Sequence, residues 1–169
     1  MDIGAISPLE LVKAKREHTA RLANQRGASG ELMALAAMQH WLPRPSGKAL
    51  EALLGELRLA GKPIKRTSFD AVHLAEGVSV DFLDSQSIRN ALPAMTFIEI
   101  KAATQTRVKE GFAGFFFALT EGEIAAADAL GAQHRVALYN RISGELLLTS
   151  VPEILARSRS LNWQLSVQL

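Results

Sequence analysis

One segment of this chain carries a carboxylate and an ammonium group two residues apart. The apolar run MTFIEIKA, residues 95–102, is typical of a central β-strand and contains Glu99 and Lys101. Side chains two apart on a strand point to the same face, so these two project together while Ile98 and Ile100 face the opposite layer. A buried carboxylate and ammonium are costly unless they pair or do chemistry. A surface ion pair on an edge strand explains the same pattern.

Two more acidic residues are candidates for the same site. Asp70 lies just inside a second predicted strand, residues 68–74. If the strands of Asp70 and Glu99 are neighbours, two carboxylates and a lysine meet at one point, which suits Mg²⁺ with the lysine beside a metal-bound water. Glu31 begins a largely buried helix whose N-terminus should face the sheet, where Glu31 is a further candidate ligand. Alternatively, Asp70 caps a turn, and Glu31 is simply favoured in a first helical turn.

The elements that must position these residues follow from periodicity and capping signals. Helices are predicted over residues 8–26, 30–42, 48–59, 121–130 and 152–157. Strands are predicted over 68–74 and 77–83 as a hairpin, over 95–102 and 114–119, over 134–140 and 145–149 as a second hairpin, and over 162–167. The helix 121–130 opens with the capping box Thr120-Glu121-Gly122-Glu123. This order indicates an α/β fold with a mixed sheet and helices on its faces.

The composition excludes several kinds of chemistry. The 169 residues include no Cys, so a disulfide scaffold, a thiolate zinc site and a cysteine nucleophile are excluded, and a cytoplasmic location is expected. No apolar run is long enough for a membrane span, and the first residues do not resemble a secretory signal. Without a glycine-rich phosphate loop, no nucleotide cofactor is expected.

The net charge of +2 is divided unevenly along the chain. Residues 1–69 hold 11 basic and 6 acidic residues, whereas residues 70–169 hold 8 and 11. A basic N-terminal part suggests a surface that faces a polyanion, although a solvated helix face explains it at least as well. Candidate nucleic-acid contacts are Lys13, Arg16, Arg21, Lys65 and Arg66, with Gln105 for a neighbouring polar contact.

The order of these acidic residues and the lysine along the chain resembles the pattern of the PD-(D/E)XK nuclease superfamily. The family pattern is an acidic residue on a helix, a strand with Asp, a strand with Glu-x-Lys, a crossover helix and another strand. Here it corresponds to Glu31, to Asp70 in TSFDAV, and to Glu99 and Lys101 in FIEIKAA. The segment GFFFALTEGEIAAADALGAQHRVALYN is similar to the domain at the C-terminus of the plant NO VEIN protein and in many bacterial proteins. The resemblance covers roughly residues 27–141.

The resemblance implies a restriction-endonuclease-like fold over residues 27–169, with residues 1–26 as a basic helix packed on or extending that domain. It also implies hydrolysis of DNA phosphodiester bonds with Mg²⁺ or Mn²⁺, in restriction, defence or repair. In that mechanism Asp70 and Glu99 hold the metal, Lys101 orients or deprotonates the attacking water, and Glu31 supports a ligand or a second ion. A homodimer is expected because cutting both strands needs two sites.

Two other functions fit the same sequence. A catalytically inactive nuclease-fold domain would bind nucleic acid or protein without cutting. An unrelated α/β domain would use Glu99 and Lys101 merely as an ion pair. Cleavage of DNA separates the nuclease from both alternatives, and DNA binding separates the two alternatives from each other.

Overall fold

The sheet is built around one long strand. The computed structural model describes residues 29–161 apart from 32, 37 and 39. Its strands lie in the order β1-β2-β3-β4-β5, with bounds Trp41–Pro43, Ala71–Leu74, Met95–Ala103, His134–Asn140 and Leu146–Thr149. Neighbouring strands are antiparallel except for β3 and β4, which are parallel. The protein is therefore an α/β protein with a mixed sheet, as the sequence predicts.

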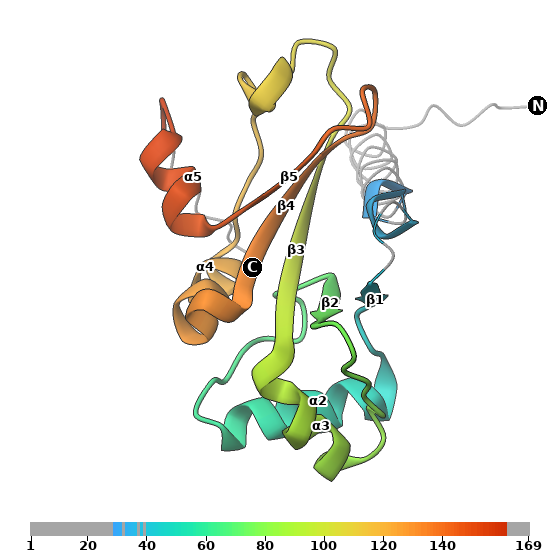
Figure 1. Cartoon of the computed structure of the whole chain (residues 1–169). Coiled ribbons are helices and arrows are strands. Elements are labelled where there is room, and N and C mark those ends of the chain that lie inside the picture. The colour runs from blue at the N-terminus through green and yellow to red at the C-terminus, as the bar shows by residue number, and fades with distance from the viewer. Residues whose placement is uncertain (1–28, 32, 37, 39, 162–169) are drawn as a thin grey trace, which may run out of the picture.

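Helices connect and cover these strands (Figure 1). They comprise a helical segment within residues 29–36, α2 (Gly47–Leu59), α3 (Ser85–Ala91), α4 (Glu121–Leu130) and α5 (Val151–Arg157), with 3₁₀ turns at Leu92–Ala94, Glu110–Phe112 and Gly131–Gln133. Parallel neighbours need a crossover connection, and α4 supplies it between β3 and β4. Among the described helices, none is long and apolar enough to cross a membrane.

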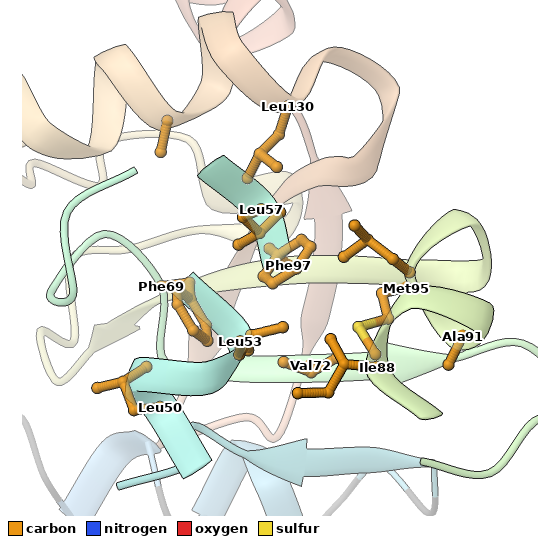
Figure 2. Packing of buried hydrophobic residues seen from close by; sticks show 12 residues of the cluster. Leu50, Leu53, Leu57, Phe69, Val72, Ile88, Ala91, Met95, Phe97 and Leu130 are labelled. Atoms are coloured by element: carbon orange, nitrogen blue, oxygen red, sulfur yellow. The ribbon is translucent and has the colours of Figure 1, made fainter. Parts of the chain in front are cut away.

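One face of the sheet packs against α2 and α3. Leu53 and Leu57 of α2 belong to the same buried cluster as Phe97 of β3 and Phe69, which precedes β2 (Figure 2). The rings of Phe69 and Phe97 meet edge to face, with their centroids 5.2 Å apart. This packing fixes the residues just before β2 against the middle of the sheet.

The opposite face of β3 is covered by the helical segment within residues 29–36. Ala34 of this segment packs with Ile98 and Ile100 of β3 and with Trp41 of β1. Because both faces of β3 are buried, its sequence is almost continuously apolar.

Side chains along β3 alternate between the two faces as predicted. Ile98 and Ile100 belong to the cluster just described, whereas Lys101 contacts Glu123 of α4 on the other face. Glu99 contacts Lys101 and therefore projects with it. Two charged residues of the central strand thus lie between the sheet and α4.

The predicted helix over residues 30–42 is too long. Met38 no longer belongs to the helix, and Trp41–Pro43 forms β1, which pairs with β2. Trp41 is buried in the sheet cluster, so pairing with a distant strand outweighs the helical periodicity of the local sequence. Pro43 is tolerated because β1 lies at the edge of the sheet, where a missing N–H costs little.

The predicted hairpin of strands 68–74 and 77–83 is wrong in its second strand. Residues 77–83 form turns and irregular backbone, and only Ala71–Leu74 of the first strand is extended. The chain then enters α3, which the sequence prediction missed. The Asp84 side chain caps α3 by accepting hydrogen bonds from the N–H groups of Gln86 and Ser87.

The predicted buried strand over residues 114–119 is also wrong. This segment has no regular structure, and Phe116 is 65% exposed. Phe112 and Gly114 have positive φ angles of 63° and 82°, which turn the chain out of the extended conformation. The rings of Phe115 and Phe117 pack against each other at a tilt of 35°, with their centroids 5.0 Å apart, instead of pairing within the sheet.

The other predicted elements are confirmed where the structure describes them. α2, β3, α4, α5 and the hairpin of β4 and β5 form within one residue of the predicted bounds. The predicted helix 8–26 and the predicted strand 162–167 lie outside the described residues.

Candidate active site

Asp70 continues the pairing between β2 and β3 with its side chain. Its backbone N–H donates to the Ile98 carbonyl at 2.8 Å, and its Oδ2 accepts from the Ile100 N–H at 2.8 Å. β2 begins only at Ala71, so the carboxylate satisfies a β3 N–H just beyond the end of that strand. Asp70 thus bonds to both chain neighbours of Glu99, and the structure brings these two acidic residues together.

Glu99 is deeply buried and only partly hydrogen-bonded. The residue is 5% exposed, and its Oε1 lies 2.9 Å from Lys101 Nζ. Its Oε2 is buried with no hydrogen-bond partner among the described residues. The pKa of Glu99 is raised to about 8, mainly by burial and secondly by the negative charge of Asp70. An oxygen without a partner is therefore buried beside a second carboxylate.

Lys101 lies between two carboxylates. Its Nζ is 2.9 Å from Oε1 of Glu99 and 2.9 Å from Oε2 of Glu123. Burial alone would lower the pKa of Lys101, but the two carboxylates outweigh burial and raise it. Lys101 is therefore a charged ammonium group at neutral pH.

Glu123 is a site residue that sequence reasoning missed. Its N–H donates to Thr120 Oγ1 at 3.2 Å, and its Oε2 accepts from the Thr120 N–H at 3.0 Å, which completes the predicted capping box of α4. The same Oε2 bonds to Lys101. The capping box was visible in the sequence, but its contact with β3 depends on how α4 crosses the sheet.

Glu31 and Arg44 also interact with Asp70 or its neighbours. The pKa of Glu31 is raised, mainly by burial and secondly by the negative charge of Asp70. The positive charges of Arg44 and Lys101 oppose that shift. Arg44 donates its N–H to the Asp70 carbonyl at 2.9 Å and its Nη1 to the Phe69 carbonyl at 2.8 Å. The structure therefore brings Glu31 within electrostatic range of the predicted site, and it adds Arg44, which the sequence prediction did not include.

Asp70 carries a carboxylate whose proton affinity is increased. Burial raises the pKa of Asp70, and the hydrogen bond from Ile100 and the positive charge of Arg44 offset that only in part. Asp70, Glu99 and Glu31 therefore all have raised pKa values in one region of the molecule. Excess negative charge in a buried region favours binding of a proton or a cation.

The donor set fits a divalent ion held by two carboxylates. Asp70 is close enough for its charge to raise the pKa of Glu99, and Glu99 Oε2 has no partner in the described part of the chain. Mg²⁺ commonly takes one or two carboxylates and completes its shell with water and substrate oxygens. No group of three His, Asp or Glu side chains that could hold an ion is found among the described residues, and Glu31 stays a prediction as a ligand.

The predicted nucleic-acid contacts are only partly described. Lys13, Arg16 and Arg21 lie outside the described residues, whereas Lys65 and Arg66 are exposed. The side chain of Lys65 passes close to Gly122, where an added Cβ atom would lie 3.2 Å from Lys65 Cδ. Lys65 thus flanks the first turn of α4, next to Glu123.

Gln105 is half-buried, and its side chain is directed into its own loop. Its Oε1 accepts a hydrogen bond from Arg107 Nε at 3.2 Å. Nothing in this geometry links Gln105 to the carboxylates, so it stays a prediction for a nucleic-acid contact.

Comparison with known proteins assigns no family. No family model, no curated protein and no solved structure matches this chain. The inference of function therefore depends on the site residues and their chemistry.

Proposed function

We propose that this protein is a metal-dependent DNA endonuclease with a restriction-endonuclease-like fold, of the PD-(D/E)XK superfamily and close to the NO VEIN C-terminal group. One observation carries the proposal: the buried Glu99 Oε2 has no partner, beside Asp70 and an ammonium group. A structural ion pair has no need of such an oxygen, whereas a cation site does.

The order of the elements supports the same proposal. Glu31 lies on a helix, Asp70 directly precedes β2, and Glu99 and Lys101 lie on β3. α4 then crosses to β4, which is parallel to β3. This is the order of acidic residues, lysine and crossover helix in the superfamily pattern.

The residues have distinct roles in the proposed reaction. Asp70 and Glu99 would hold Mg²⁺ or Mn²⁺, and Glu31 would support that site electrostatically. The bound ion would neutralise charge on the scissile phosphate and activate a water molecule. Lys101 keeps its proton because its two carboxylate partners raise its pKa. It therefore orients the attacking water or a phosphate oxygen by donating a hydrogen bond, and of its two predicted roles this geometry favours orientation over proton abstraction.

The proposed partner is DNA, bound by a homodimer in the cytoplasm. Lys65 flanks the first turn of α4, and exposed Lys65 and Arg66 would contact backbone phosphates, giving an affinity that falls with salt. Cleavage of both strands needs two active sites, which two copies of this chain would supply.

A catalytically inactive interaction domain is the second candidate. With Glu99 protonated below about pH 8, Lys101 and Glu123 form a neutral ion pair, so this cluster can be neutral without a metal ion. The absence of a three-residue metal cluster among the described residues also favours this candidate. It predicts DNA or protein binding without hydrolysis.

Plasmid cleavage tests the proposal. Purified protein should nick or linearise supercoiled plasmid with Mg²⁺ or Mn²⁺, and a chelator should stop the reaction. Lys101→Met should lower the rate by about 100-fold or more, because it removes a positioned donor from the reacting groups, while DNA affinity stays within about twofold. The matched control is Lys109→Met, since Lys109 is an exposed lysine in the loop after β3. Binding without cleavage under any divalent ion would establish the interaction domain instead.

A further inference from the structure

Lys101 depends on other residues for its position. A lysine side chain has four rotatable bonds and a strongly hydrated ammonium group, so it occupies one position only where other groups hold it. Here the Nζ atom bonds to Glu99 on the same strand and to Glu123 on α4, both at 2.9 Å. Of these two residues, Glu99 is assigned above to the metal ion.

Glu123 is itself held in place by the first turn of α4. Its Oε2 accepts from the Thr120 N–H at 3.0 Å, and its N–H donates to Thr120 Oγ1 at 3.2 Å. The residue is 6% exposed, so water competes little for its carboxylate. One oxygen therefore both caps a helix and binds the ammonium group of Lys101, and the capping box fixes where that oxygen lies.

We infer that Glu123 is the positioning residue for Lys101 and keeps it at the reacting phosphate while Glu99 binds the cation. The inference rests on the proposed function. A cation on Glu99 Oε2 reduces the negative charge that Glu99 presents to Lys101 and repels the ammonium group. Glu123 bonds to Lys101 from a different element, so it keeps that hold when Glu99 is engaged.

The chain contains a matched control for this role. α5 opens with the same capping box, in which the Ser150 N–H donates to Glu153 Oε2 at 2.9 Å and the Glu153 N–H donates to Ser150 Oγ at 3.4 Å. There the second partner of the carboxylate is the Thr149 hydroxyl, at 2.9 Å, and not a lysine. Replacing Glu153 therefore measures the loss of a capping carboxylate without any effect on Lys101.

The test compares Glu123→Gln with Glu153→Gln in the full chain. Glutamine can still accept from the capping N–H but carries no charge, so Glu123→Gln removes mainly the attraction for Lys101. Cleavage should fall by about 10- to 100-fold, the usual effect of losing a residue that orients a site group, with DNA affinity unchanged. Glu153→Gln should change cleavage by less than about twofold.

A second readout does not depend on activity. The pKa of Lys101, followed by NMR of its side-chain amine, should fall in Glu123→Gln because an opposing charge is lost, and should not change in Glu153→Gln. Other charged groups in range of Lys101 are Glu99, Asp70 and Glu31, which are identical in all variants. Glu123→Asp, which keeps the charge, should retain a higher Lys101 pKa than Glu123→Gln.

The outcomes separate this inference from the proposed function. If wild-type protein cleaves DNA and Glu123→Gln leaves both cleavage and the pKa of Lys101 unchanged, the positioning role is wrong and the nuclease stands. If no variant cleaves but the pKa of Lys101 falls only in Glu123→Gln, the contact is established while the nuclease proposal fails.

Discussion

Two buried acidic residues of this chain have opposite acid–base properties. Glu56 bonds to Arg89 through both oxygens, at 3.0 and 3.2 Å, and the hydrogen bonds and charge of that arginine lower its pKa. Glu99 is equally buried but keeps one oxygen without a partner in the described part of the chain, and its pKa is raised to about 8. Glu56 is a completed structural ion pair, whereas Glu99 keeps a buried oxygen that is free among the described residues, which the proposed metal site would use.

The raised pKa of Glu99 predicts how ion binding depends on pH. Below about pH 8 the Glu99 carboxyl holds a proton that a metal ion must displace, so apparent Mg²⁺ affinity should rise with pH and level off above pH 8. Loss of one proton corresponds to about tenfold in affinity per pH unit well below the pKa, and to about 50-fold between pH 6 and pH 8, where Glu99 is half-deprotonated. Calorimetric titration across this range measures it.

Glu99→Gln supplies the control for that titration. The amide cannot be deprotonated and is a poor ligand for Mg²⁺, so binding should weaken and lose its pH dependence. Equal affinity for wild-type protein at pH 6 and pH 8 would show that Glu99 does not take up the ion.

Asp70, Glu99 and Lys101 could be predicted as site residues from the sequence, but Glu123 and Arg44 could not. Side chains that are two residues apart on one strand point to the same face, so the pairing of Glu99 with Lys101 could be predicted from local geometry alone. Glu123 and Arg44 meet the site through α4 and through the segment after β1. Their positions depend on the path of connections that no local pattern specifies.

At the scale of elements, one glycine sets how closely a helix lies on β3. A Cβ atom on Gly30 would lie 2.4 Å from the Cβ atom of Ala102, well inside van der Waals contact. The next residue along the helix is Glu31, which is in electrostatic range of Asp70. Because Gly30 has no Cβ atom, the helix can lie close enough to β3 to bring Glu31 near Asp70.

Gly30→Ala should therefore destabilise the protein although alanine favours helices. Overpacking of this kind costs about 1–3 kcal/mol, more than the gain in helix propensity. Gly55→Ala is the matched control, because Gly55 lies inside α2 with nothing within 4 Å of an added Cβ atom, and it should stabilise the protein by about 0.5–1 kcal/mol. Urea unfolding measures both values.

A compensating change makes that prediction specific. Ala102→Gly removes the methyl group that an alanine at Gly30 would meet, so the double variant should recover most of the lost stability. If Gly30→Ala and Gly55→Ala have the same effect on the free energy of unfolding, the close approach of this helix to β3 is wrong.

Elements with strong local signals were predicted well, and those formed by distant contacts were not. α4 has a complete capping box, and β3 is a long apolar run, so both were predicted within one residue. β1 forms where Trp41 pairs with β2, and residues 114–119 form no strand, with Gly114 at a positive φ at their start. These two features depend on tertiary packing that outweighs local propensity.

At the scale of the whole molecule, the topology concentrates acidic side chains at the middle of β3. Figure 1 shows β2, β4 and α4 around β3. Asp70, just before the antiparallel neighbour β2, bonds to β3, and Glu123 lies on α4, the crossover to the parallel neighbour β4. The helical segment on the opposite face brings Glu31. Segments far apart in the sequence therefore meet around Glu99 and Lys101, and the mixed sheet is what makes this possible.

Locating an ion in the folded protein tests this arrangement most directly. Crystals of the full chain grown with Mn²⁺ should show an anomalous difference peak about 2.1 Å from Glu99 Oε2 and an Asp70 oxygen, a distance typical of hard divalent ions. The peak should be missing in Glu99→Gln crystals grown in the same way. A wild-type crystal with no ion between Asp70 and Glu99, or with the ion bound elsewhere, would contradict the metal site and with it the proposed nuclease.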